Sequence, residues 1–367
     1  MMKRMLSLLL IVAILLTMTA CGHPNNQNRA ETHVVVDHAG YEVEVPVEVN
    51  RIAVCSILPL PSVLAVFFDS AEKIVGMASG SKTAAANSLL GQLYPELLDA
   101  ETSFIEGGNL NVEELMKLAP DVVFYNTAEA EVGDQLRNAG FCAVAVSVNK
   151  WDYNATKTLE NWIGLLSEIF PDNDKAEIVG QYSERIYDLV QSRVAEIPER
   201  ERVFFLYKYG DTSIMTSGAK FFGQWWAEAI GAVNVGQEMT TDNSVTVNME
   251  QIYAWNPSLI FITNFTTAYP EDLAGNTVGN YDWTPVDAVK SDRVYKMPLG
   301  LYRSYTPGVD TPITLLWLAK TAYPEQFEDI DIMVETQKYY KEVFNIDLTE
   351  NQAASIFAPE AKVGAGF

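Results

Sequence analysis

The chain has 367 residues, of which 48% are apolar, and its 25 Lys and Arg face 48 Asp and Glu, a formal net charge of −23 at pH 7. This length suits two domains of about 150 residues each, and the apolar fraction is enough for real cores. Nucleic acid is excluded as a partner, because binding to phosphates needs a basic surface.

Residues 1–20 are predicted to be a lipoprotein signal peptide. Lys3 and Arg4 precede the apolar run Met5–Met18, which is shorter than the roughly 20 residues of a transmembrane helix. The run Met-Thr-Ala-Cys that ends at Cys21 resembles a bacterial lipobox, in which the Cys becomes the lipid-modified first residue. An ordinary secretory signal with an incidental Cys is the alternative. The resemblance implies an extracytoplasmic protein that is lipid-anchored to the cell membrane.

Residues 21–32 are polar and are predicted to form a flexible tether. Residues 33–173 are then predicted to form an N-terminal α/β lobe. It begins with a β-hairpin over His33–Val47, whose turn contains Gly40. Further strands are expected at Arg51–Ile57, Lys73–Ala78, Val122–Asn126 and Phe141–Ser147. Helices are expected at Pro61–Asp69, Asn87–Leu98, Val112–Leu118, Glu129–Ala139 and Ala155–Ile169.

The alternation of strands and helices predicts a mostly parallel sheet, whose ligands lie at the carboxyl ends of the strands. Ser56, Asn109 and Asn126 stand at such ends and are candidate ligand contacts. The strand-end segments are Ser56–Pro61, Ser79–Lys82, Gly107–Asn109 and Asn126–Ala128. Cys55 and Cys142 lie on apolar strand-like runs, where we expect free thiols. A disulfide, which exported proteins can form, is the alternative.

Residues 174–197 are predicted to form a connecting helix. Apolar residues recur there at spacings of three and four, with Asp174 as the cap and Pro198 after the end. About 24 residues would span roughly 36 Å, enough to bridge two lobes. A peripheral packing helix is the alternative.

Residues 198–367 are predicted to form a C-terminal α/β lobe with the same alternation. Strands are expected at Arg202–Tyr209, Leu259–Thr263 and Arg293–Pro298. Helices are expected at Phe222–Ile230, Met249–Trp255, Asp310–Thr321, Ile332–Phe344 and Thr349–Phe357.

One pattern occurs twice in the chain. Leu110–Thr127 and Val247–Asn264 align at a constant offset of 137, so that Asn111 matches Asn248. Both copies predict an Asn-capped helix, a proline stop and a buried strand. The repeat indicates two similar lobes, with a chance match of a common helix–strand pattern as the alternative.

Several motifs together resemble the substrate-binding proteins of ABC importers for iron–siderophore, haem and cobalamin. They are the hairpin VVVDHAGYEVEVPVEVNRIAV, the pair NVEELMKLAPDVV and NMEQIYAWNPSLI, and the end DTPITLLWLAKTAYPEQF. The resemblance implies two Rossmann-like lobes joined by one long helix, with ligand in the cleft between them. It implies a monomer without an intrinsic cofactor, whose partners are a metal chelate such as a ferric siderophore and an ABC permease with its ATPase. Glu113 and Glu250 match the acidic residues that dock on the permease.

The sequence offers little for catalysis. His23, His33 and His38 are the three histidines, and none lies beyond the N-terminal hairpin, so the rest of the first lobe and the whole second lobe offer no His base or His metal ligand. No nucleotide-cradling glycine motif is present. The prediction is therefore a binding protein rather than an enzyme, with no protein-held metal. An exported enzyme using an acid pair and an anchored sensor domain are the alternatives from other classes, and cobalamin or haem is the alternative ligand.

The candidate ligand contacts of the second lobe are mainly aromatic. Tyr302, Arg303 and Tyr305 follow the last predicted strand, where Arg303 suits a planar anion such as a carboxylate, catecholate or hydroxamate. Phe222, Trp225 and Trp226 lie at a predicted helix start. Helical spacing makes one of the two tryptophans a core residue, and the sequence does not decide which one.

Overall fold

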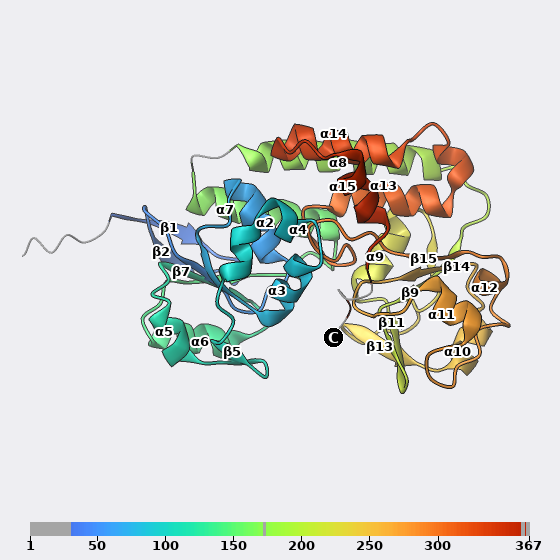
Figure 1. Cartoon of the computed structure of the whole chain (residues 1–367), viewed down its shortest axis with the longest axis horizontal. Helices are drawn as coiled ribbons and strands as arrows, with labels where there is room; N and C mark the ends of the chain where they lie inside the picture. Colours follow the sequence, from blue (N-terminus) through green and yellow to red (C-terminus); the bar gives the residue numbers. More distant parts are fainter. Residues whose placement is uncertain (1–30, 172–173, 361–363, 365–367) are drawn as a thin grey trace, which may run out of the picture.

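The computed structural model describes residues 31–171, 174–360 and 364. Two α/β lobes lie side by side beneath a layer of long helices (Figure 1). The predicted signal peptide, Cys21 and nearly all of the predicted tether lie outside the described residues. Within the described ranges, no helix is both long and apolar enough to cross a membrane.

The predicted N-terminal hairpin is confirmed. Strands β1 (Thr32–Val36) and β2 (Glu42–Pro46) pair antiparallel. Asp37 shapes the turn, because its carboxylate accepts hydrogen bonds from backbone N–H groups within the turn and from Ala145 N at 3.0 Å. Gly40 has φ +87°, a left-handed conformation that glycine adopts without strain. The hairpin is thereby fastened to the edge of the first-lobe sheet.

The first lobe contains a four-stranded parallel sheet in the order β4-β3-β7-β8. Its strands are β4 (Ile74–Met77), β3 (Ile52–Val54), β7 (Val122–Asn126) and β8 (Ala143–Val146). Helices α2 (Leu60–Phe68), α5 (Val112–Lys117), α6 (Ala130–Asn138) and α7 (Ala155–Ile169) follow the prediction closely. Nearly every strand residue is buried, as expected for a sheet covered on both faces.

The single helix predicted over Asn87–Leu98 is wrong. Helix α3 (Ser79–Ala86) ends before this segment, which instead contains the short α4 (Leu90–Leu93) and most of a 3₁₀ turn, η1 (Pro95–Asp99). Alanines favour α3, whereas a proline has no N–H to continue α4, so a new turn begins at Pro95. Strands β5 (Ile105–Glu106) and β6 (Asn109–Leu110) then form a small hairpin.

The second lobe repeats the arrangement with the order β12-β9-β14-β15. Its parallel strands are β12 (Val233–Asn234), β9 (Arg202–Leu206), β14 (Leu259–Ile262) and β15 (Val294–Lys296). The strand predicted to run to Tyr209 stops at Leu206, and β10 (Lys208–Gly210) joins β11 (Ser213–Ser217) and β13 (Ser244–Val247) in an antiparallel sheet. The sequence did not predict β11 and β13, which are short and mix polar with apolar residues. Helices α9 (Phe222–Ala229), α10 (Met249–Trp255), α11 (Pro270–Gly275) and α12 (Asp287–Lys290) complete the lobe.

Helix α8 (Lys175–Val194) crosses the top of both lobes (Figure 1). It begins and ends within the predicted range 174–197, and Asp174 makes no side-chain capping hydrogen bond. The helices α13 (Thr311–Ala322), α14 (Ile332–Phe344) and α15 (Glu350–Phe357) and the turn η2 (Pro324–Phe327) complete this layer. The predicted fold class, two parallel-sheet lobes joined by one long helix, is confirmed.

The sequence repeat falls on equivalent elements of the two lobes. Asn111 caps α5 by accepting from Glu114 N at 3.1 Å, and Asn248 caps α10 by accepting from Gln251 N at 2.9 Å. The following strands, β7 and β14, occupy the same inner position in the two sheets. The repeat therefore marks a shared architecture rather than a chance match.

Candidate ligand-binding site

The carboxyl ends of β9, β14 and β15 carry the candidate site of the second lobe. Tyr207 follows β9, the segment Thr263–Phe265 follows β14, and the loop with Arg303 follows β15. Because β9, β14 and β15 are neighbours in one parallel sheet, these segments meet at the same edge.

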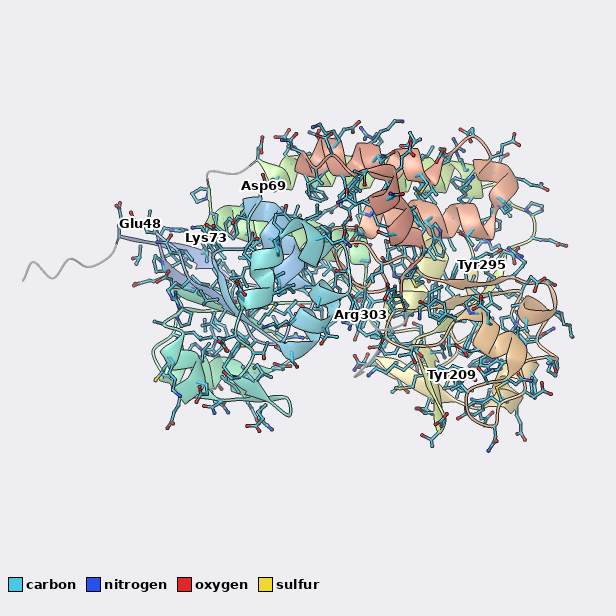
Figure 2. The ribbon with its side chains drawn as sticks, in the orientation of Figure 1. Glu48, Asp69, Lys73, Tyr209, Tyr295 and Arg303 are labelled. Atoms are coloured by element: carbon cyan, nitrogen blue, oxygen red, sulfur yellow. The ribbon has the colours of Figure 1, made fainter. Side chains whose placement is uncertain are left out.

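Arg303 lies where the two lobes meet (Figure 2). Its side chain is fully buried. Nε donates to Asn264 O at 3.0 Å, and Nη1 lies 3.0 Å from the Tyr302 hydroxyl. Nη1 also reaches 3.5 Å to the carbonyl oxygen of Gly80, which belongs to α3 of the first lobe. One guanidinium thus contacts both lobes.

Aromatic rings surround this guanidinium. Its central carbon lies 5.1 Å from the Phe265 ring centroid and 5.3 Å from the Tyr302 centroid, both within cation–π range. Burial raises the pKa of Tyr302 to about 12, and the same effect raises the pKa of Tyr207 to about 12. Burial lowers the pKa of Arg303 itself, so the site already strips much water from its cation.

Asn264 has a buried acceptor that no described residue satisfies. Its Nδ2 donates to Met297 O at 2.9 Å and to Pro298 O at 2.8 Å, which fixes the orientation of the amide. Its Oδ1 then has no hydrogen-bond partner among the described residues. A buried acceptor left in this state costs free energy until a donor arrives.

Three of the predicted aromatic contacts are buried and packed against other core residues. Trp226 is fully buried, and its Nε1 donates to Tyr305 O at 2.9 Å. The Tyr305 hydroxyl accepts from Gly223 N at 3.0 Å, so its polar end is directed into the lobe. Phe222 packs edge-on against Tyr153 of the first lobe, with ring centroids 5.1 Å apart. Helical and loop positions in the sequence could not separate these residues from Tyr302 and Arg303.

Trp225 faces a different hollow. It lines a surface depression together with residues of α7 and α8, including Glu160, Glu184 and Tyr187. None of the residues around Arg303 lines this hollow. The hollow that Trp225 lines is therefore distinct from the surroundings of Arg303, although the two tryptophan rings are in edge contact, with centroids 4.6 Å apart.

The predicted first-lobe contacts are only partly brought together. Ser56 and Asn126 are neighbours, because Ser56 Oγ accepts from Asn126 N at 3.3 Å across the ends of β3 and β7. Asn109 lies on β6 in an open hollow lined also by Glu113, a hollow that Ser56 does not line. Arg303 does contact the first lobe at the Gly80 carbonyl, which lies within the predicted strand-end segment Ser79–Lys82.

The sequence also missed Tyr207 and Lys296. Tyr207 sits inside the predicted strand 202–209, and only the actual end of β9 at Leu206 places it at the carboxyl edge. Lys296 ends β15 and is almost completely buried. A lone Lys in an apolar strand is the signal that could have identified it, since unpaired lysines are rarely buried.

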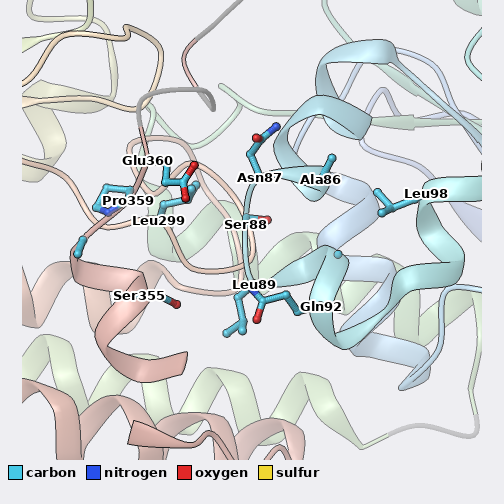
Figure 3. Close-up of a pocket in the computed structure, with 12 residues that line it drawn as sticks. Ala86, Asn87, Ser88, Leu89, Gln92, Leu98, Leu299, Ser355, Pro359 and Glu360 are labelled. Atoms are coloured by element: carbon cyan, nitrogen blue, oxygen red, sulfur yellow. The ribbon is translucent and has the colours of Figure 1, made fainter. Parts of the chain in front are cut away.

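A cavity of about 410 Å³ lies beside the site, between the lobes. Asn87, Ser88 and Gln92 line it from the first lobe, opposite Leu299 and Glu360 of the second lobe (Figure 3). A backbone hydrogen bond joins the two lobes beside this cavity, because Leu89 N donates to Gly300 O at 3.3 Å. The loop that carries Arg303 is therefore held against the first lobe at its start.

Of the described histidines, neither His33 nor His38 contacts Arg303 or the residues around it. His38 accepts from Ser147 N at 3.1 Å, and burial lowers its pKa to about 4. The described ranges contain no group of three His, Cys, Asp or Glu residues placed to hold a metal ion. Cys55 and Cys142 are free thiols, as predicted.

Glu113 and Glu250 are both exposed, in the first turns of α5 and α10. Within the described residues neither forms an ion pair. One turn further on, Met116 is 50% exposed and Tyr253 is 38% exposed, again at matched positions of the repeat. Helices α5 and α10 lie at the side of the molecule away from α8 (Figure 1). Each lobe thus presents an exposed glutamate with a large, partly exposed apolar or aromatic side chain three residues later.

A family model described as periplasmic binding protein matches residues 70–299. The molybdate-binding protein MolA of Haemophilus influenzae is 27% identical over 345 residues, covering 88% of this chain and 93% of that protein. A periplasmic solute-binding protein of Veillonella parvula is 28% identical with a TM-score of 0.78, covering 89% of this chain and 97% of that one. The structure of Haemophilus influenzae MolA bound to molybdate is 23% identical with a TM-score of 0.71, covering 86% and 99% of the two chains.

Proposed function

The chain belongs to the periplasmic binding protein family, and we propose that it captures an iron–siderophore-type chelate in the cleft between its lobes. Members of this family are solute-binding proteins of ABC importers rather than enzymes, and they work outside the cytoplasm. The proposal adds the class of solute, which is an anionic chelate that Arg303 binds. We further propose that the protein acts as a lipid-anchored monomer.

Arg303 is the observation that carries this proposal. The guanidinium stands at the carboxyl edge of the second-lobe sheet and reaches Gly80 O in the first lobe. Separation of the lobes would expose it to an incoming ligand, and closure would bury the pair again. In a chain of net charge −23, an anionic solute meets repulsion except where a fixed cation is placed. The planar fork of Arg303 matches catecholate, hydroxamate and carboxylate groups.

A metal oxyanion is the second candidate, and the molybdate-binding relative favours it. Both candidates are anions, so Arg303 suits either. Asn264 distinguishes the two classes of ligand, because its buried Oδ1 has no hydrogen-bond donor among the described residues. A siderophore with hydroxyl or amide groups brings such a donor, whereas molybdate carries no proton at neutral pH. Cobalamin and haem remain the alternative ligands, and the same binding test includes them.

The test is titration of the soluble form from Gly22 with ferric siderophores, molybdate, haem and cobalamin, read by native mass spectrometry and Trp fluorescence. Losing a charge-assisted contact costs about 1.5–3 kcal/mol, so Arg303→Ala is expected to weaken binding of an anionic ligand by roughly 10- to 100-fold. Arg200→Ala is the matched control, because Arg200 is exposed and its loss changes the net charge equally. Unaltered affinity of Arg303→Ala for every anionic ligand that binds the wild type would refute the assignment. For cobalamin, whose charge is small, little change is expected.

We also propose that Glu113 and Glu250 dock the loaded protein on its permease. Both are exposed, and the repeat places them at equivalent positions of the two lobes. The flanking Met116 and Tyr253 add apolar area, and the Tyr253 hydroxyl donates to Asp282 O at 2.6 Å, which fixes its ring. A partner with two like sites, each basic with an apolar neighbour, would fit this surface.

A further inference from the structure

Lys296 is a buried cation close to the proposed site. It ends β15 and is 9% exposed. Its Nζ donates to three backbone carbonyls: Thr263 O at 3.0 Å, Thr266 O at 2.8 Å and Ala268 O at 2.8 Å. All three N–H donors of the ammonium are therefore used. A buried ammonium is costly without such partners.

The three carbonyls belong to a single loop, Thr263–Ala268, which also holds Arg303. Asn264 O accepts from Arg303 Nε at 3.0 Å, and the Phe265 ring centroid lies 5.1 Å from the guanidinium carbon. Lys296 and Arg303 thus bind the same loop from two sides. Carbonyls that bind Lys296 stand on both sides of Asn264 and Phe265, the two residues that contact Arg303.

Threonine hydroxyls fasten this loop to the neighbouring strands. Thr263 Oγ1 donates to Tyr207 O at 2.6 Å, and Thr266 Oγ1 donates to Tyr209 O at 2.9 Å. These hydrogen bonds fix the threonine side chains, whereas the carbonyl groups of Thr263, Thr266 and Ala268 are oriented by their hydrogen bonds to Lys296. Without a donor at that point, three buried carbonyls would lose their partner, and the backbone would turn to find others.

We propose that Lys296 is a positioning residue for the ligand site. By binding Thr263 O, Thr266 O and Ala268 O, it fixes the loop whose Asn264 carbonyl and Phe265 ring orient the Arg303 guanidinium. The inference rests on the proposed role of Arg303 as the ligand contact. It assigns to Lys296 an effect on ligand affinity that passes through Arg303.

The test is a double-mutant cycle between Lys296→Met and Arg303→Ala, with affinity measured for a ferric tris-catecholate and for molybdate. Lys296→Met keeps the length of the side chain and removes the three hydrogen bonds. On its own it is expected to weaken binding by threefold or more, bounded by the loss in Arg303→Ala. In the Arg303→Ala background it is expected to change affinity by less than twofold, because the contact it positions is already gone. If the fold-losses in affinity of the two single variants multiply in the double variant, the two residues act independently, and the positioning role of Lys296 is refuted.

Lys320→Met is the matched control. Lys320 is also partly buried and donates to one carbonyl, Phe327 O at 2.7 Å, away from the cleft. It is expected to leave affinity unchanged. If Lys296→Met does not fold, Lys296→Gln replaces it in the test. Lys296→Gln retains two N–H donors, so its loss of affinity is expected to be smaller than that of Lys296→Met. Full affinity in a folded Lys296 variant, with Arg303→Ala impaired, would overturn this inference alone. Full affinity in Arg303→Ala would overturn the proposed function and the inference together.

A second readout needs no ligand. Phe265 N donates to Thr263 Oγ1 at 3.1 Å, and Ala268 N donates to Thr266 Oγ1 at 3.3 Å. In Lys296→Met these two amides are expected to exchange with deuterium at least tenfold faster, while amides of β9 and β14 keep their rates. Unchanged exchange in the loop would show that Lys296 does not hold it and would refute the proposal.

Discussion

The change Asp310→Asn tests how the loop that carries Arg303 is held. Asp310 is 6% exposed, and its Oδ2 accepts from Leu301 N at 2.7 Å. Its Oδ1 accepts from the Tyr340 hydroxyl of α14. A Cβ on Gly300 would lie only 2.2 Å from Asp310 Oδ1, so the loop backbone is pressed against the carboxyl group. Asp310 thereby ties the start of the loop to the helical layer.

Burial raises the pKa of Asp310 from 3.8 to about 6, while the hydrogen bonds from Tyr340, Leu301 and Tyr302 oppose the rise. The folded state therefore holds a proton on Asp310 over a pH range where the unfolded state has lost it. The contribution of Asp310 to stability is fully present below pH 4 and is lost as pH rises through about 6. The difference between the two pKa values corresponds to about 3 kcal/mol.

Asparagine has the same shape, keeps an acceptor for Leu301 N and does not ionise. The measurement is urea denaturation of both proteins between pH 4 and pH 7, followed by Trp fluorescence. The free energy of unfolding of the wild type, relative to Asp310→Asn, is expected to fall by about 3 kcal/mol as pH rises across this range. Asp329→Asn is the control, because Asp329 is exposed at the molecular surface. Parallel pH dependence in wild type and Asp310→Asn would refute the reasoning.

Three further changes address other parts of the molecule. The pair Glu113→Arg and Glu250→Arg is expected to stop uptake while ligand affinity and melting temperature stay unchanged; normal uptake would remove the docking proposal. Trp226→Ala is expected to lower the free energy of unfolding by about 3–5 kcal/mol, whereas Trp225→Ala is expected to cost less in the same urea assay, because Trp225, although buried, also lines the hollow beside α7 and α8. Cys21→Ser is expected to abolish incorporation of labelled fatty acid, and equal labelling in mutant and wild type would contradict the lipobox.

Elements with a strong period or a strong cap could be predicted from the sequence. Helix α14 has the predicted bounds, and Asn111 and Asn248 cap α5 and α10 as expected. The failures have local causes. Strands β11 and β13 pair antiparallel, so only one face of each is buried and the sequence lacks a continuous apolar run. The helix predicted over Asn87–Leu98 failed because Pro95 cannot continue α4, so a separate 3₁₀ turn begins there.

The site was predictable only where strand ends define it. Tyr302 and Arg303 follow β15, and the rule that ligands bind at carboxyl ends was sufficient to select them. The same rule selected Tyr305, yet its hydroxyl is directed inward to Gly223 N. Side-chain direction within a loop depends on tertiary contacts that the sequence does not encode locally. Gly80 lies in the predicted strand-end segment Ser79–Lys82, but its carbonyl could not be singled out from the sequence, because every residue has one.

The two lobes share an architecture but differ at the last strand of each sheet, and this difference explains why the polar groups of the site lie mainly in one lobe. The pairings Phe124↔Val144 and Phe261↔Tyr295 place Ala145 of β8 and Lys296 of β15 at equivalent positions. At Ala145 the N-terminal hairpin covers the edge, since Asp37 accepts from Ala145 N. No hairpin of the described residues covers the equivalent edge at Lys296, and the side chain binds the loop that holds Arg303. The proposed docking residues lie at positions that the repeat shares, whereas the proposed recognition residues lie where it does not, so a partner can meet both lobes alike while the ligand is distinguished mainly by one.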